Sequence, residues 1–185
     1  MAGLGNPGKR YAATRHNTGA MAAELLAERW GLGRSKEKFR GRLYEGRAGP
    51  GGPRTFVLLP GTCMNESGDS VGPARGSLKV PLDRLLVIYD EIDLPFGEIQ
   101  AKLGGGMAGH NGLRSVKRGL GSADFWRLRV GVGRPQSTDP EIVSAHVLSR
   151  FSEPDADVEA LLSSAADEAE RLVERIGSSP YPSRP

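Results

Sequence analysis

Cysteine is nearly absent from this sequence: Cys63 is the only one in 185 residues. A single cysteine excludes a framework of internal disulfides and fits a reducing compartment. The chain also lacks an apolar run of about 18 residues and a signal-peptide pattern at its start. We therefore expect a cytoplasmic protein with no membrane span.

Histidine and aromatic residues are scarce too, with three histidines and 6% aromatics in the whole chain. His16 and His110 both occur in turn-rich segments, and an asparagine directly follows each of them. Such segments are poor at forming a core but suited to presenting side chains to a ligand. The pattern predicts a site built from histidine, aspartate and asparagine.

The charge is distributed unevenly although the net charge is only +3. Basic residues predominate up to residue 152, and acidic residues predominate in 153–175. A basic surface attracts a polyanion such as a nucleic acid. A composition rich in solvated arginines explains the same excess, so the charge alone leaves both interpretations open.

Apolar residues alternate or recur with helical spacing in several segments. The patterns predict helices over 19–30, 111–120 and 153–176, and strands over 39–45, 55–59, 85–89, 99–103 and 126–132. Together they indicate an α/β fold, a single domain over residues 1–177 with a twisted mixed β-sheet flanked by helices. Residues 178–185, rich in serine and proline, are expected to form a flexible tail.

The predicted strand 85–89 is apolar throughout most of its length, as is typical of a strand buried on both faces. Asp90 follows it, at the edge where open α/β sheets bind ligands. An imidazole is a suitable general base near neutral pH, and a carboxylate partner fixes its tautomer and stabilises its protonated form. His16 and Asp90 are therefore the predicted catalytic pair.

No side-chain nucleophile stands out beside this pair. Ser67 and Ser70 do not lie in the G-x-S-x-G turn of α/β-hydrolases. Nothing near Cys63 in the sequence indicates an activated thiol. The residues favour activation of water over attack by a side chain.

The spacing of the motifs leaves two other kinds of site open. Residues 3–8 match the G-x-G-x-x-G pattern of dinucleotide-binding folds, but only two residues precede the motif, so no full strand leads into it. A metal ion has candidate ligands in His16, Asp90, Asp93 and His110, although they lack the H-E-x-x-H or paired-cysteine spacing of common metal sites. We rank both interpretations below the His–Asp pair.

Asparagines accompany the candidate catalytic residues in turn-like segments. Asn6, Asn65 and Asn111 each offer a donor and an acceptor, which suits recognition of a peptide group or an ester carbonyl. The glycines at 104–106 precede a predicted helix and provide a candidate cradle for phosphate. These features predict a polar rim around the histidine and the aspartate.

Four motifs together resemble those of the bacterial-type peptidyl-tRNA hydrolase family. They are G-L-G-N-P-G-x-x-Y-x-x-T-R-H-N-x-G (3–19), M-N-x-S-G (64–68), D-E-x-D-L-P-x-G (90–97) and G-G-G-x-x-G-H-N-G-L (104–113). The motifs occur in order and span most of the chain, and L-R-V-G-V-G-R-P (128–135) agrees as well. Their combination is highly specific.

The resemblance implies a hydrolase that cleaves the ester between peptide and tRNA in peptidyl-tRNA. It implies a monomer that needs no metal or other cofactor and does not act on DNA or membranes. His16 corresponds to the general base, Asp90 to its supporting carboxylate, and Asn6 to the residue that distinguishes blocked from unblocked aminoacyl ends. The resemblance also implies substrate-binding roles for Tyr11, Cys63, Met64, Asn65, His110 and Asn111, and contacts to tRNA phosphate for Lys102 and Arg129.

The sequence departs from the family pattern at several points. Cys63 replaces an aromatic residue, 107–108 replaces a more polar pair, and Gln100 stands where a second basic residue occurs. The segment before Asn6 is short, so we expect either a short first strand at an edge or a start further upstream. A non-catalytic RNA-binding relative is the alternative function, and the presence of both His16 and Asp90 favours the enzyme.

Overall fold

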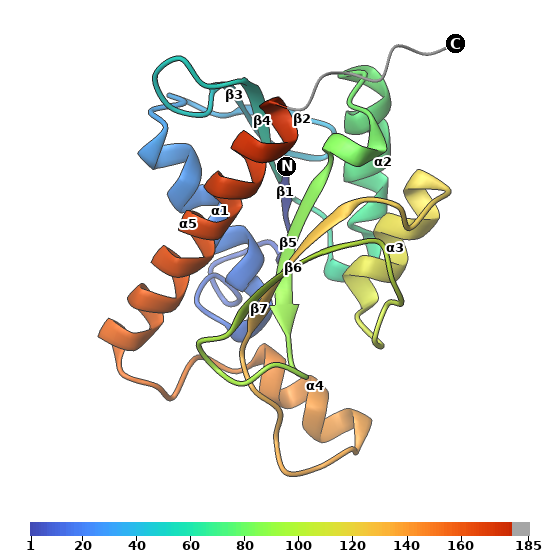
Figure 1. Cartoon of the computed structure of the whole chain (residues 1–185). Coiled ribbons are helices and arrows are strands. Elements are labelled where there is room, and N and C mark those ends of the chain that lie inside the picture. The colour runs from blue at the N-terminus through green and yellow to red at the C-terminus, as the bar shows by residue number, and fades with distance from the viewer. Residues whose placement is uncertain (179–185) are drawn as a thin grey trace.

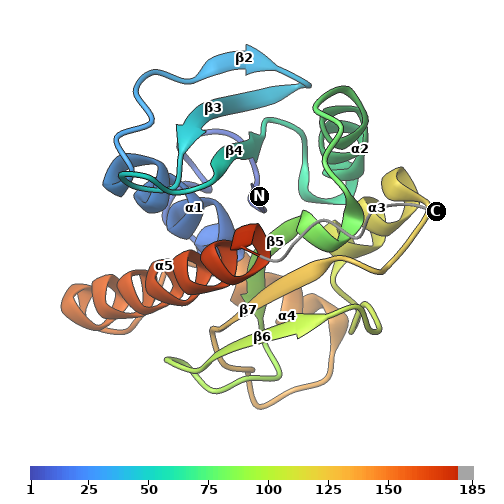
Figure 2. The same ribbon diagram turned by 45° about the horizontal axis from the view of Figure 1, so that its top comes forward.

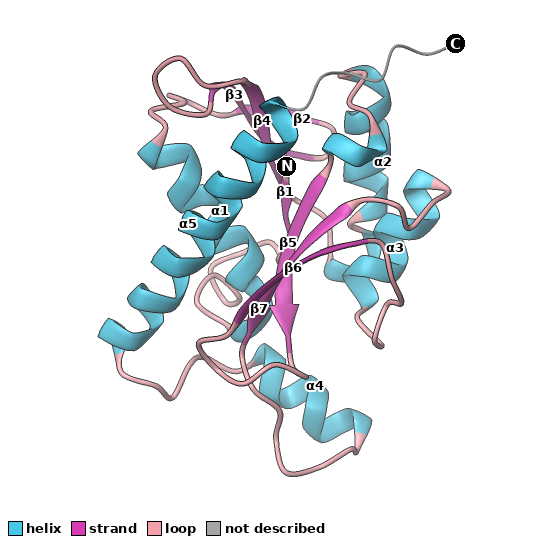
Figure 3. Ribbon diagram, viewed as in Figure 1, coloured by secondary structure: helices cyan, strands magenta, loops and turns pink. Residues whose placement is uncertain are grey.

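The computed structural model describes residues 1–178, which form one mixed sheet flanked by helices (Figures 1 and 3). The strand order is β2-β3-β4-β1-β5-β7-β6, with β1, β4, β5 and β7 parallel to one another and β2, β3 and β6 running against their neighbours. The strands are β1 Ala2–Gly3, β2 Lys36–Lys38, β3 Gly41–Arg47, β4 Arg54–Pro60, β5 Leu86–Glu91, β6 Ile99–Leu103 and β7 Trp126–Gly131. The predicted α/β class and mixed sheet are thus confirmed.

Helices cover both faces of this sheet. Helices α1 (Thr18–Arg29) and α5 (Asp155–Ser178) pack on one face, and α2 (Gly68–Ser77) and α3 (Asn111–Leu120) pack on the other (Figures 1 and 2). Helix α4 (Pro140–Leu148) lies apart from these layers, near the carboxyl end of β5 (Figure 1). Short 3-10 turns complete the described chain: η1 Arg15–Asn17, η2 Met64–Glu66 and η3 Leu82–Arg84. No helix in residues 1–178 is both long and apolar enough to cross a membrane.

Strand β1 has only two residues, yet it lies in the middle of the sheet between β4 and β5. The expectation of an edge position was therefore wrong, whereas the expected shortness is observed. The glycines around it bring α1 close to the sheet: a Cβ on Gly19 would lie 2.2 Å from the carbonyl oxygen of Ile88, and one on Gly3 would lie 2.4 Å from that of Gly19. The first glycine of the motif at 3–8 is thus explained by helix packing. The motif therefore gives little support to a dinucleotide-binding site.

Most predicted elements are found within a few residues of their expected ends, and α3 occupies the predicted 111–120. Helix α5 begins at Asp155 and continues through Gly177 to Ser178, beyond the predicted end at 176. The predicted tail therefore begins in a helical residue, and from 179 onward it lies outside the described residues.

The sequence patterns did not predict β1, β2, α2 or α4. Helix α2 contains Gly72, Pro73 and Gly76, which have low helix propensity. Its glycines allow a close approach to α3, because a Cβ on Gly68 would lie 2.0 Å from the carbonyl oxygen of Ser115. Tertiary packing therefore forms α2 where local propensity opposes it.

Candidate active site

A cavity of about 630 Å³ opens at the carboxyl end of β5. Loops that follow parallel strands converge at this edge of the sheet, which is where α/β folds place their ligands. The sequence motifs contribute His16, Asp90 and three asparagines to its wall, and α4 closes another side. The lining residues are Asn6, His16, Met64, Asn65, Asp90, Glu91, Ile92, Ala108, Gly109, His110, Asn111, Arg114, Arg134, Thr138, Pro140, Val143, Ser144, Val147 and Leu148.

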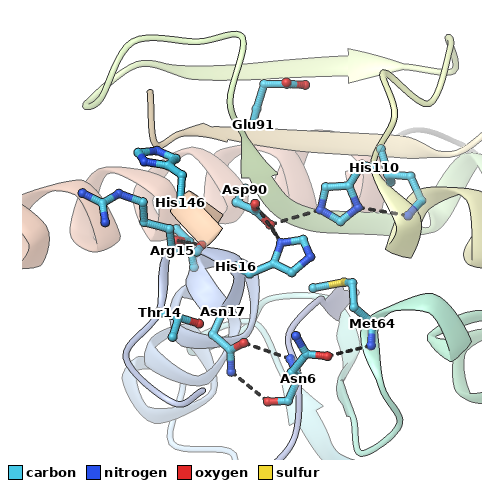
Figure 4. A network of polar contacts seen from close by, with 12 residues as sticks. Asn6, Thr14, Arg15, His16, Asn17, Met64, Asp90, Glu91, His110 and His146 are labelled. Carbon is cyan, nitrogen blue, oxygen red and sulfur yellow. Dashed lines mark hydrogen bonds and ion pairs between the residues drawn. The ribbon is translucent and has the colours of Figure 1, made fainter. Parts of the chain in front are cut away.

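Two histidines share one carboxylate at the base of this cavity (Figure 4). The Nδ1 atom of His16 lies 2.9 Å from both carboxylate oxygens of Asp90, and the Nε2 atom of His110 lies 3.0 Å from Oδ1. Asp90 is only 2% exposed. The structure therefore places His110 beside the carboxylate of Asp90 as well as on the cavity wall.

The hydrogen bonds fix which ring nitrogens carry protons. An ionised carboxylate only accepts hydrogen bonds, so His16 donates from Nδ1 and His110 donates from Nε2. The Nδ1 atom of His110 accepts a bond of 3.3 Å from the backbone N–H of Leu113, at the start of α3. In neutral His16 the lone pair is then on Nε2, the nitrogen that Asp90 does not contact, as a general base requires.

The pKa of Asp90 is held well below its ordinary value of 3.8. Burial alone would raise this pKa, but the attraction and hydrogen bonds from His16 and His110 outweigh the burial and lower it. Asp90 is therefore an anion at neutral pH. A buried anion next to an imidazole favours the protonated imidazolium that forms when the base accepts a proton.

Asn6 is held firmly by its neighbours. Its backbone N–H donates to Asn17 Oδ1 and its carbonyl oxygen accepts from Asn17 Nδ2, both at 2.9 Å. Its side-chain Oδ1 accepts a bond of 2.8 Å from the backbone N–H of Met64. The amide orientation is thereby fixed, and Figure 4 shows the Nδ2 atom pointing towards His16.

The other predicted substrate-binding residues divide into two groups. Met64, Asn65, His110 and Asn111 line the cavity, and Asn111 accepts a 2.6 Å bond from Arg114. Cys63 is exposed beside the cavity-lining Met64 but is not among the described lining residues, and neither is Tyr11. The guanidinium of Arg10 lies 5.3 Å from the centre of the Tyr11 ring.

The two predicted phosphate contacts lie on neighbouring strands, Lys102 on β6 and Arg129 on β7. Arg129 donates to Glu91 at 3.1 Å and to Gln100 at 2.7 Å, so its guanidinium is already oriented. Gln100, which replaces a basic residue of the family pattern, thus serves as a hydrogen-bond acceptor here. The side chain of Lys102 lies over Gly105, since a Cβ placed there would be 3.2 Å from Nζ.

Arg127 is buried beneath the glycine loop, although it lies on the same strand as Arg129. It is 2% exposed and donates to the carbonyl oxygens of Gly106 at 2.5 Å and Gly105 at 2.8 Å. Burial lowers the pKa of its guanidinium. Arg127 therefore holds the backbone of the glycine loop through these hydrogen bonds and is not available to contact a ligand on the surface.

Sequence reasoning missed several residues at the site. Asn17 orients Asn6, and its place directly after His16 within the first motif was the available signal. Helix α4 was not predicted, so the wall that its apolar side chains form was not foreseen. Arg134 also lines the cavity and donates two hydrogen bonds to one carboxylate oxygen of Asp93, at 3.0 and 2.6 Å.

His16, Asp90 and His110 are also the one group of three described residues whose donor atoms lie close enough to suggest a metal site, within 4.8 Å of one another. A metal on His110 Nε2 would require the proton to sit on Nδ1. That nitrogen faces the backbone N–H of Leu113, which is itself a donor. The arrangement around His110 therefore fits a hydrogen-bonded network better than a ligand set.

The fold and the site define a class: an α/β protein with a buried carboxylate that orients an imidazole in a polar cavity at the carboxyl ends of its strands. The family model described as "Peptidyl-tRNA hydrolase" matches residues 1–179. The chain is 46% identical over 187 residues to the peptidyl-tRNA hydrolase of Mycobacterium avium, covering 100% of this chain and 95% of that one. It is 49% identical over 152 residues to that of Syntrophotalea carbinolica, covering 82% and 78%.

Solved structures agree with the sequence comparisons. The crystal structure of peptidyl-tRNA hydrolase from Acinetobacter baumannii matches with a TM-score of 0.79 and 35% identity, covering 96% of this chain and 93% of that one. The chain belongs to the peptidyl-tRNA hydrolase family.

Proposed function

We propose that this protein hydrolyses the ester that joins a peptide to tRNA, with His16 as the general base. The observation that carries the assignment is the hydrogen bond from His16 Nδ1 to a buried, ionised Asp90. It leaves Nε2 free to accept a proton at the wall of a cavity large enough for a peptide end. The family of the chain supports the same reaction.

In the proposed mechanism, Nε2 of His16 takes a proton from a water molecule as the water oxygen attacks the ester carbonyl. Asp90 stabilises the imidazolium that results. The carbonyl oxygen becomes an oxyanion, which a hydrogen-bond donor at the cavity wall stabilises; one well-aimed donor contributes roughly 10²–10³ in rate. The intermediate then expels the ribose oxygen, which receives the proton from the imidazolium, and the products are free tRNA and a peptide acid.

The proposed selectivity depends on the fixed amide of Asn6. Because its Oδ1 already accepts from Met64, the group presented to substrate is the donor Nδ2. A donor suits the carbonyl oxygen of a blocked amino end and does not suit the ammonium of an unblocked one. We assign contacts with the peptide and the terminal nucleotide to Asn65 and Asn111, and contacts with tRNA phosphates to Lys102 and Arg129.

Further parts of the proposal concern the surroundings of the enzyme. We place it in the cytoplasm, where translation provides peptidyl-tRNA, and we propose that it acts as a monomer without a metal or other cofactor. Few large apolar side chains are exposed in the described chain, namely Leu103, Ile142 and Leu148. A surface of this kind suits a monomer.

The test compares N-acetyl-aminoacyl-tRNA with unblocked aminoacyl-tRNA as substrates, both with EDTA present. We expect cleavage of the blocked substrate only and no effect of EDTA. Loss of activity in EDTA would identify a metal-dependent hydrolase. A folded protein that binds tRNA but cleaves neither substrate would contradict the proposal and favour the non-catalytic RNA-binding alternative.

A further inference from the structure

Arg15 directly precedes His16 in η1, and its guanidinium is enclosed by a distant segment. Arg15 is 4% exposed. It donates to the side chains of Ser149 at 2.9 Å, Ser152 at 3.0 Å and Glu153 at 2.8 Å, and also to the carbonyl oxygen of Arg150. All four partners belong to the connection between α4 and α5.

Backbone contacts strengthen the same attachment. The N–H of Arg15 donates to the carbonyl oxygen of Ser149 at 3.1 Å, and Thr14 forms an antiparallel bridge with Arg150. The ring of Phe151 lies 5.1 Å from the Arg15 guanidinium, within the range of a cation–π contact. The turn that carries His16 and the α4–α5 connection are therefore one structural unit.

The other end of this unit is a wall of the cavity. Helix α4 ends at Leu148, immediately before the enclosed segment, and its side chains Val143, Val147 and Leu148 line the cavity. No residue of α4 is fully buried, so the helix has little core packing to fix its position. Its attachment at the C-terminal end therefore affects where the α4 wall lies, and Figure 4 shows the side chain of Arg15 extending away from the ring of His16.

We propose that Arg15 is a positioning residue that holds the general base His16 and the α4 wall in a fixed relation. The inference rests on the proposed function for the role of His16 as the base, and it adds that the α4 wall contacts the peptide. A planar guanidinium donates to several acceptors at fixed angles, which the ammonium of lysine cannot reproduce. Small displacements of a catalytic group have large effects, since about 1 Å can cost about 10²-fold in rate.

The test uses Arg15→Lys, with Arg29→Lys as the matched control. Arg29 also joins the amino-terminal part of the chain to α5, through Asp167 at 2.6 Å and Ser163 at 2.8 Å, but it lies outside the cavity. Each variant is assayed in single turnover with an N-acetyl-aminoacyl-tRNA and with a longer peptidyl-tRNA. Thermal unfolding and affinity for tRNA are measured on the same samples.

For Arg15→Lys we expect the single-turnover rate to fall about 10-fold to 100-fold, with tRNA affinity unchanged. We also expect the longer peptide to lose any advantage over the acetyl group, because the inference assigns contact with the α4 wall to the longer peptide. Arg29→Lys should change neither the hydrolysis rate nor the ratio of rates between the two substrates. A residue that only stabilises the fold would lower the unfolding temperature and leave the ratio between the two substrates as it is.

A normal single-turnover rate and a normal ratio of rates between the two substrates in folded Arg15→Lys would overturn the positioning role while leaving the proposed function intact. An inactive wild-type protein would overturn both proposals. If Arg15→Lys does not fold, Ser152→Ala and Glu153→Gln each weaken one contact of the guanidinium. They should produce the same change in substrate ratio at smaller size, and their failure to do so would equally reject the inference.

Discussion

At the scale of single residues, the proposed mechanism depends on the negative charge of Asp90. Its pKa lies below the ordinary value of 3.8, so its ionised form stabilises the folded state. This contribution is complete above the pKa of the unfolded chain and is lost as the pH falls through the folded-state value. Any loss of activity between about pH 5 and 7 must then come from a group other than Asp90.

Asp90→Asn tests this directly. The asparagine can place a donor where the carboxylate accepts, and the tautomer of His16 is then no longer fixed. We expect the hydrolysis rate to fall roughly 10²–10⁴-fold, measured at saturating substrate. The difference in unfolding free energy between wild type and variant should shrink as the pH falls below about 4, because wild type then loses the contribution of the ionised Asp90. A variant with nearly normal rate would show that Asp90 does not support the base.

Asn6→Asp tests the proposed selectivity. The aspartate keeps the acceptor for Met64 N–H and replaces the Nδ2 donor with an oxygen that attracts ammonium. We expect the preference for N-acetyl-aminoacyl-tRNA over aminoacyl-tRNA to fall by about tenfold, as for the loss of one hydrogen bond of ~1.4 kcal/mol. The ratio of kcat/KM for the two substrates measures it. An unchanged ratio would exclude Asn6 as the discriminating residue.

At the scale of elements, glycines determine how closely helices approach the sheet and one another. Gly19→Ala would place a methyl group 2.2 Å from the carbonyl oxygen of Ile88, so α1 must shift away from the sheet. We expect a loss of about 1–3 kcal/mol in unfolding free energy, measured by urea denaturation. Gly76→Ala in α2 is the control, because no atom lies within 4 Å of the added Cβ. It should keep or raise stability, and equal losses in both variants would contradict the packing argument.

The elements also show what a sequence pattern can and cannot predict. Helix α3 has strong apolar periodicity and the buried β5 is apolar over most of its length, and the sequence predicted both well. Helix α2 contains three glycines and a proline, which are weak helix formers, and it forms through contacts with α3 that only the tertiary structure provides. Strand β1 is too short for any period to be visible.

The same distinction applies to the site. His16, Asp90 and the asparagines could be predicted as site residues because they lie in short motifs whose polar, turn-forming residues are unsuited to a core. His110 and Asp90 are 20 positions apart in the sequence, and Arg15 is about 135 positions from the segment that encloses it. Such pairings follow from the strand order of the sheet and from the path of the α4–α5 connection, and no local pattern encodes them.

At the scale of the whole molecule, binding of tRNA should depend on a few cations at one edge of the sheet. Lys102 lies on β6, at the opposite edge from β2, which carries Lys36. Lys102→Ala should weaken tRNA binding and reduce the slope of log affinity against log salt by about 1, without changing the preference for blocked substrates. Lys36→Ala should leave affinity and slope unchanged. Equal effects of both variants would show that net charge, not a localised contact, governs binding.

The central claim is that His16 activates water for ester hydrolysis. The most direct measurement is the single-turnover hydrolysis rate of N-acetyl-aminoacyl-tRNA by wild type and by His16→Ala at saturating enzyme, with tRNA affinity measured in parallel. The account predicts a rate lower by about 10²–10⁴ in a folded variant that binds tRNA normally. A His16→Ala rate within about threefold of wild type, far below the effect of losing a general base, would contradict it.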